Sequence, residues 1–163
     1  MRLAEERLMA LEPAVVWDAV LDTGVWLRCV PSLDSLTGTP DAGYDAVVVQ
    51  RIGPLKARFS GRITLSDVVW GESLTVTGGG QGGIAGFARG VAVVRLEPAA
   101  GGTRLVYELQ AEVGGRLGQL GGRIVESVAK SLADQFFARF ERAAAGLPAE
   151  SVPRKGWLGR LIG

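Results

Sequence analysis

The fold of this 163-residue chain is decided by residues 103–140, TRLVYELQAEVGGRLGQLGGRIVESVAKSLADQFFARF. The first part alternates apolar and polar residues, with Leu105, Tyr107 and Leu109 on one side, as a strand with one buried face does. After residue 116 the apolar residues follow the spacing of a helix. The stretch therefore predicts a strand that leads into one long helix over 116–145, lying obliquely across a twisted sheet.

Glycines crowd the start of this predicted helix: they are Gly114, Gly115, Gly118, Gly121 and Gly122. A glycine inside a helix costs roughly 1 kcal/mol relative to alanine, so these positions need a reason. Close packing of the helix on the sheet is one explanation. The other is that the glycines leave room for a ligand beneath the helix.

Composition excludes several classes of function. The net charge is only +1, so no strong field attracts nucleic acid, and none is expected as a partner. The chain has no histidine, which excludes Ser-His-Asp and Cys-His catalysis and removes the commonest nitrogen ligand of metals. Cys29 is the single cysteine, so neither a disulfide nor a cysteine metal cluster is expected. With no signal peptide in the first residues and no spanning apolar run, we expect a cytoplasmic protein.

The rest of the chain reads as short strands and helices. Strands are expected over 2–11, 33–39, 44–52, 55–66, 72–77 and 85–97, with two short helices after the first strand, from Pro13 and after Asp22. Gly78–Gly83 is expected to be a glycine-rich turn, because the strand-like residues after it do not suit a phosphate loop. Hairpin-length gaps make the sheet antiparallel, so the chain predicts an α+β domain. Such a curved sheet with one helix across it encloses space for a small apolar ligand.

Four segments of the chain carry a family resemblance: VWDAVLDTGVWLRCVPSLDSL (16–36), GPLKARFSG (53–61), GGIAGFARGVAVVRLEP (82–98) and GTRLVYELQAEVGGRLGQLGGRIV (102–125). They resemble the CoxG family, the G subunit of carbon monoxide dehydrogenase, within the START-like, Bet v 1-like helix-grip (SRPBCC) superfamily. Residues 136–140, FFARF, extend the last of these segments. The sequence departs from the family at Val30-Pro31-Ser32, where a glycine is expected after the proline.

The resemblance implies a ligand-binding domain over 1–145, with a curved sheet of about seven strands around a long C-terminal helix. It also implies a non-catalytic accessory protein of an aerobic CO dehydrogenase-type molybdenum hydroxylase. Members are implicated in recruiting the enzyme to the inner face of the cell membrane, and the fold commonly holds a lipophilic molecule. A respiratory quinone of the electron-transport chain, menaquinone or ubiquinone, is the natural ligand, with no covalent cofactor.

Eight apolar or aromatic residues and one glycine are candidates to line a cavity. The set comprises Trp26, Phe59, Phe87, Tyr107, Leu117, Leu120, Gly121, Ile124 and Phe136. The plainer interpretation makes each of them a core residue. The Tyr107 phenol could bind a quinone carbonyl, or it could satisfy a partner inside the protein.

After the domain, residues 146–153 read as a linker and residues 154–163 as a basic amphipathic tail. In a helix the tail would place Trp157, Leu158, Leu161 and Ile162 on one face, and Arg154, Lys155 and Arg160 add positive charge. That pattern is typical of a membrane-surface anchor. Docking on a partner protein and packing against the domain remain alternatives.

Two other functions fit parts of this sequence. A docking adaptor of the same fold would have a filled interior. A cyclase or aromatase would need an acid or base in the cavity, and no histidine is present to serve as one.

Overall fold

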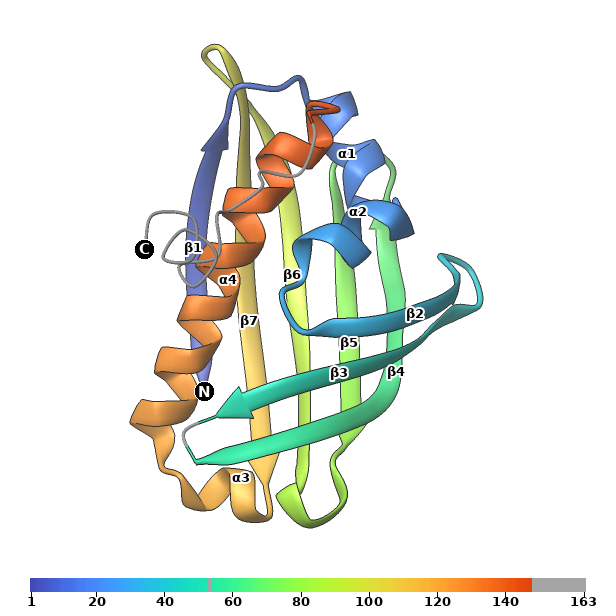
Figure 1. Ribbon diagram of the computed structural model, residues 1–163. Coiled ribbons are helices and arrows are strands. Elements are labelled where there is room, and N and C mark those ends of the chain that lie inside the picture. Colours follow the sequence, from blue (N-terminus) through green and yellow to red (C-terminus); the bar gives the residue numbers. More distant parts are fainter. Residues whose placement is uncertain (53, 148–163) are drawn as a thin grey trace, which may run out of the picture.

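One antiparallel sheet dominates the computed structural model, which describes residues 1–52 and 54–147 (Figure 1). Seven strands follow the order β1-β7-β6-β5-β4-β3-β2. Their bounds are β1 (Arg2–Met9), β2 (Leu33–Thr39), β3 (Gly43–Ile52), β4 (Leu55–Val69), β5 (Ser73–Gln81), β6 (Phe87–Ala99) and β7 (Gly102–Gly114). Only β1 is out of sequence order, because it pairs with β7. The predicted seven-stranded antiparallel α+β fold is confirmed.

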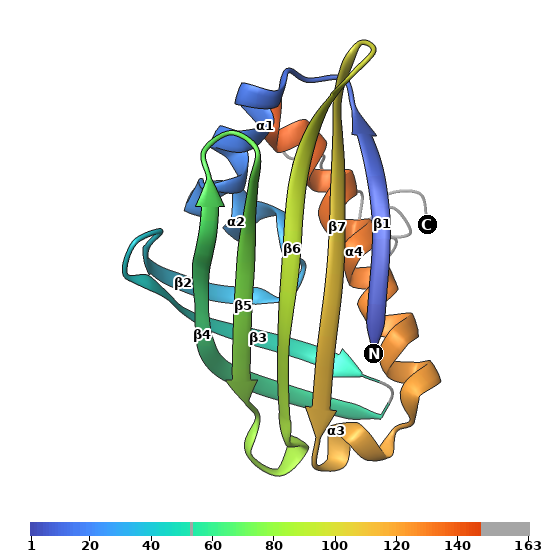
Figure 2. The same cartoon turned by 180° about the vertical axis from the view of Figure 1, so that it is seen from behind.

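The long helix and the first two short helices lie on the concave face of this sheet, and the other two helical turns lie at its lower end in Figure 1 (Figures 1 and 2). The short helices are α1 (Pro13–Val20), α2 (Thr23–Cys29), α3 (Arg116–Gln119) and the 3-10 turn η1 (Gly83–Ala85). The long helix α4 (Gly122–Ala144) runs across the sheet. Pro13 lies in the first turn of α1, and the Asp22 carboxylate accepts a hydrogen bond from Gly24 N at 2.8 Å to cap α2.

Alternating side chains fix which face of each strand turns toward α4. In β4 every second residue from Leu55 to Leu65 is partly buried, and those between them are exposed. In β7, Leu105 and Tyr107 are buried, as the alternation predicts. The period of two in the sequence therefore determines the inner face of the sheet.

The glycine-rich segment differs from the prediction of a turn. Gly78, Gly79 and Gly80 belong to β5, where they pair with Gly90, Arg89 and Ala88 of β6. The turn begins only at Gly82, and η1 follows. Glycine has low strand propensity, but ladder hydrogen bonds on both sides of β5 hold these residues extended.

The predicted single helix over 116–145 is interrupted. The chain leaves α3 at Leu120, passes through Gly121 with φ of +91°, and starts α4 at Gly122. A Cβ added at Gly121 or Gly122 would meet nothing within 4 Å, so close packing does not explain these two glycines. The left-handed backbone at Gly121 explains the first of them, because residues with a side chain rarely adopt it.

The closely packed core lies at one end of the molecule, where α1, α2 and the end of α4 meet the sheet. Its most buried side chains are Val16, Cys29, Leu74, Thr103 and Phe140. Burial raises the pKa of the Cys29 thiol, which keeps it protonated and inert. Phe140 is 1% exposed and is the one fully buried residue along α4. The rest of this helix is therefore less tightly covered.

Candidate ligand-binding cavity

A cavity of about 410 Å³ lies between the sheet and residues 129–140 of α4. It falls in the range of about 300–1,000 Å³ typical of small-molecule sites. Its walls come from both layers: Val20, Trp26, Val30, Pro31, Ser32, Val48, Val76, Ala92, Val94, Leu105, Tyr107, Leu109, Ala129, Leu132, Ala133, Phe136, Phe137 and Phe140.

The position of α4 leaves this space open. The helix contacts α1, α2, β1 and β3 around the rim of the sheet more than the strands at its centre. Where α4 faces the middle of the sheet, the small side chains of Ala129 and Ala133 oppose Ala92 of β6 in the cavity wall. Larger side chains at these positions would fill the space between the two layers.

The cavity wall offers a ligand almost no free hydrogen-bonding side chain. Trp26 Nε1 donates to the Val20 carbonyl at 2.7 Å, and the Ser32 hydroxyl bonds to the Gln50 side-chain carbonyl. The Tyr107 hydroxyl donates to Glu5 Oε2 at 2.7 Å. Because these groups are already paired, the wall presents apolar surface and few free hydrogen-bonding side chains.

A cluster of four charged side chains and one phenol lies beside the cavity and joins β1 to α4. We call it the β1–α4 clasp, and its members are Glu5, Arg7, Tyr107, Lys130 and Asp134. Lys130 Nζ lies 2.5 Å from Glu5 Oε1 and 2.6 Å from Asp134 Oδ1. Arg7 Nη2 lies 2.7 Å from Glu5 Oε2 and 2.5 Å from Asp134 Oδ1. The cations thus bridge a strand carboxylate and a helix carboxylate.

Aromatic rings connect the clasp to the cavity wall. The Arg7 guanidinium lies 5.0 Å from the centre of the Phe137 ring, and Phe137 stacks on Tyr107 at 5.3 Å. Phe136 packs edge-on against Phe137 and lies 5.2 Å from Trp26. The clasp therefore fixes the rings that shape one wall of the cavity.

The clasp sets the protonation of its members. Burial raises the pKa of Glu5, but hydrogen bonds from Lys130, Tyr107 and Arg7 outweigh it and leave the pKa below its usual value. Burial, with the Glu5 carboxylate beside it, raises the pKa of Tyr107 far above that of a free phenol. Hydrogen bonds from Lys130 and Arg7 lower the pKa of Asp134. At neutral pH the carboxylates are charged and the phenol is a donor.

Three of the nine residues proposed for the cavity line it: Trp26, Tyr107 and Phe136. Leu117 is buried, in a short helix that contacts β7 and η1. The Phe59 ring lies against Gly82, and the Phe87 ring lies against Gly114. Gly121 borders a separate groove between α4 and β7, Leu120 is half-buried beyond α3, and Ile124 is 42% exposed. The break at Gly121 separates the start of the helical stretch from the cavity.

The clasp was missed by the sequence reasoning, although a signal for it exists. Glu5 and Arg7 share the face of β1 that carries Leu3 and Met9, so two charges interrupt an apolar alternation. Lys130 and Asp134 are spaced as a helical i,i+4 pair. Charges on the inner face of a strand require partners, and an opposing helical pair can supply them.

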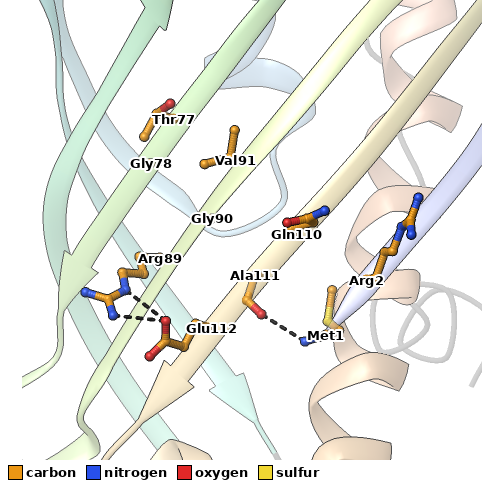
Figure 3. Close-up of a pocket in the computed structure, with 10 residues that line it drawn as sticks. All are labelled: Met1, Arg2, Thr77, Gly78, Arg89, Gly90, Val91, Gln110, Ala111 and Glu112. Carbon is orange, nitrogen blue, oxygen red and sulfur yellow. Dashed lines mark hydrogen bonds and ion pairs between the residues drawn. The ribbon is translucent and has the colours of Figure 1, made fainter.

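A second hollow lies on the outer face of the sheet (Figure 3). It has a volume of about 550 Å³ and is bordered by exposed side chains of β1, β5, β6 and β7. Arg89 and Glu112 pair across its floor at 2.9 Å, and the N-terminal amine donates to the Ala111 carbonyl at 2.9 Å. Because its lining is more polar than that of the inner cavity and its charges are paired, it is a weaker candidate for an apolar ligand.

Within the two described ranges, no cluster of carboxylate and thiol groups suits a metal ion. No helix among the same residues is long and apolar enough to cross a membrane. The proposed membrane contacts of the tail, at Arg154, Lys155, Trp157, Leu158, Arg160, Leu161 and Ile162, lie outside the described residues.

A seven-stranded sheet curved around a long C-terminal helix, with an apolar cavity between them, defines a protein of the helix-grip class. The chain belongs to the CoxG family, the G subunit of carbon monoxide dehydrogenase, whose sequence pattern matches residues 7–145. Membership of this family suggests an accessory protein associated with a CO dehydrogenase. Among curated proteins, no sequence matches the chain.

Solved structures agree on the fold. A conserved protein from Geobacillus kaustophilus is 25% identical, with a TM-score of 0.83 over 90% of this chain and 96% of its own. TTHA0849 from Thermus thermophilus is 17% identical, with a TM-score of 0.66 over 90% and 98% of the two chains. Ara h 8.0201 is 16% identical, with a TM-score of 0.61 over 90% and 98%. The latter two show the shared fold alone.

Proposed function

We propose that this protein is a non-catalytic carrier that holds a lipophilic molecule, a respiratory quinone, for a CO dehydrogenase-type molybdenum enzyme. The observation that carries the proposal is the cavity of about 410 Å³ whose polar side chains are already paired within the protein. A quinone presents a flat ring and an apolar chain, which match aromatic and aliphatic walls. The family supports the partner enzyme.

The cavity favours a carrier over the two alternative functions. A docking adaptor needs no hollow interior, and unfilled space costs stability. A cyclase needs a free acid or base facing its substrate, whereas the Glu5 carboxylate beside the cavity accepts three hydrogen bonds or ion pairs from the clasp. The carrier function accounts for both the volume and the apolar walls.

The test is native mass spectrometry of protein from a quinone-producing host, followed by extraction of any bound species. We expect a stoichiometric quinone in the wild-type protein. Ala129→Trp fills the cavity from α4 and should remove the ligand, whereas Ala138→Trp, at an exposed position of the same helix, should retain it. Equal occupancy in both variants, or an empty wild-type protein after incubation with quinone-loaded vesicles, would reject the proposal.

Recruitment of the enzyme to the membrane is the second half of the proposed function. Its support is the basic amphipathic pattern of residues 154–163. Co-sedimentation with phosphatidylglycerol vesicles should fall when this segment is deleted, and it should fall for the intact chain at high salt. Equal partitioning of the deleted and intact chains would assign recruitment to another surface.

A further inference from the structure

An exposed apolar cluster lies at the turn between β4 and β5, beside α1 (Figure 1). Val68, Val69 and Trp70 are consecutive and all exposed, and Trp70 is 74% exposed. A regular strand would turn alternate residues inward. An isolated exposed apolar residue needs no explanation, but three in a row ending in tryptophan do.

The backbone here is distorted so as to present these side chains. The β4–β5 register shifts between Ser66 and Val69, which marks a bulge. Asp67 has φ of +50°, the one positive φ outside glycine among the described residues. The turn is nevertheless held in place, because Leu96 N donates to the Glu72 carbonyl at 2.7 Å. A strained but fixed turn points to selection for the surface it presents.

Trp70 is anchored on one side only. Its ring meets the edge of the buried Trp17 ring, with 5.7 Å between centroids, and the remainder of the side chain faces solvent. This contact restricts the orientations of the ring before any partner arrives. A pre-positioned tryptophan loses little side-chain entropy on binding, and tryptophan is among the residues that dominate binding energies.

The charges around the cluster are acidic. Asp18 follows Trp17 on α1, Asp67 lies in the bulge and Glu72 lies in the turn, and all are exposed. No ion pair joins any of them to another described residue. A cation on the neighbouring strand is Arg95, paired across the ladder with Ser73. An anionic bilayer would be repelled by these carboxylates, whereas a cationic protein surface would be attracted.

We propose that Val68, Val69 and Trp70, with Asp18, Asp67 and Glu72, form a docking surface for a partner protein. We call it the Trp70 surface. The partner presents an apolar pocket for the Trp70 ring and lysine or arginine side chains around that pocket. In assigning the CO dehydrogenase-type enzyme as this partner, the proposal rests on the proposed function; the surface itself is independent of any ligand in the cavity.

The test measures binding of the full chain to the purified molybdenum enzyme of the same organism. Trp70→Ser should weaken the affinity about 30-fold, the scale of a central tryptophan contact. Glu72→Lys and Asp18→Lys should each weaken it and reduce its salt dependence, and they leave the aromatic contact intact. The matched control is Ile84→Ser, which removes an 81%-exposed apolar side chain at the opposite end of the molecule.

The following results would overturn the proposal. Unchanged affinity in Trp70→Ser, or an equal loss in Ile84→Ser, removes the Trp70 surface from the interface. An absence of binding by the wild-type chain removes the enzyme as partner. If Trp70→Ser instead lowers binding to phosphatidylglycerol vesicles or converts a dimer to a monomer, the occupant is a bilayer or a second copy. Quinone occupancy should not change in Trp70→Ser. A negative result here would therefore leave the carrier proposal untouched, and a negative result in the carrier test would leave the Trp70 surface untouched.

Discussion

Gly121 turns the chain from α3 into α4, and its positive φ makes it the most constrained glycine of that connection. Its neighbour Gly122 has an ordinary backbone conformation and equally open surroundings. Substitutions at these two positions therefore distinguish the effect of backbone strain from the effect of side-chain packing.

We expect Gly121→Ala to lower the free energy of unfolding by roughly 1–2 kcal/mol, because alanine is strained in the left-handed region. Gly122→Ala should raise it by about 0.4–1 kcal/mol, because it reduces the freedom of the unfolded chain at a position with room for a methyl group. Urea unfolding of both variants measures the difference. Equal effects of the two substitutions would contradict a special backbone role for Gly121.

Glu5 is the centre of the clasp, and its lowered pKa makes the clasp sensitive to acid. A carboxyl group whose pKa is lower in the folded state contributes stability above its unfolded pKa, and this stability is lost as the pH falls through the folded pKa. The pKa of Asp134 is also lowered, so its contribution to stability is likewise lost as the pH falls. The clasp is therefore expected to be intact at neutral pH and to weaken below about pH 4.5, the ordinary value for the Glu5 carboxyl.

We expect Glu5→Gln to cost about 2 kcal/mol at pH 7, because charge-assisted hydrogen bonds are lost. It should also flatten the decline of the melting temperature between neutral pH and acid. Glu6→Gln is the control, since Glu6 is exposed on the other face of β1 and lies 3.8 Å from Arg104. A parallel acid decline in wild type and Glu5→Gln would show that the clasp does not set this dependence.

Helix α4 is secured unevenly along its length. Its second half carries Phe136, Phe137 and Phe140, which pack on one another and on the core, whereas Ile124 near its start is 42% exposed. Among the described residues, only the clasp ties the middle of the helix to β1 by charge. The helix should therefore open from its first turns while its last turns stay packed.

Hydrogen exchange measures this gradient. Amides of residues 126–132 should exchange faster than those of residues 136–142, although both ranges are helical. Asp134→Asn should speed exchange in the first range more than in the second, because it removes the helix carboxylate of the clasp. Uniform protection along α4 would show that the helix moves as one unit.

Most elements could be predicted from the sequence, because periodicity reports burial directly. The alternation in 103–113 and 55–65 fixes two strands and their inner faces. The β5 glycines and the helix break could not be predicted this way, because both depend on backbone conformation and on neighbouring strands. The fold resemblance predicted a cavity, but six of the proposed lining residues lie elsewhere. Which apolar residues face empty space depends on how far α4 stands from the sheet, and no local pattern records that distance.

Tryptophan fluorescence can report whether a ligand occupies the cavity. The chain has four tryptophans, and among those described only Trp26 lines the cavity. A quinone bound there should quench its fluorescence. We expect Trp26→Phe to lose most of the quenching, whereas Trp70→Phe retains it. Titration with a short-chain quinone measures both, and unaltered quenching in Trp26→Phe would place the ligand outside the cavity.

The core, the cavity and the Trp70 surface occupy different parts of the molecule. The closely packed core lies where α1 and α2 meet the end of α4, and the cavity lies beside it under the same helix. The Trp70 surface lies on the outside of the core end, next to Trp17. Binding a partner there would not obstruct the middle of the sheet, where the cavity wall includes Val76 and Ala92.

The attachment of α4 at the clasp and at the core end has an evolutionary consequence. Because the helix is fastened through the clasp and the core end, side chains such as Ala129 and Leu132 can change without dismantling the fold. For the carrier that we propose, a few substitutions along one helix would then be enough to change the preferred ligand. Divergence among relatives should concentrate on that lining, while Glu5, Arg7 and Phe140 stay fixed.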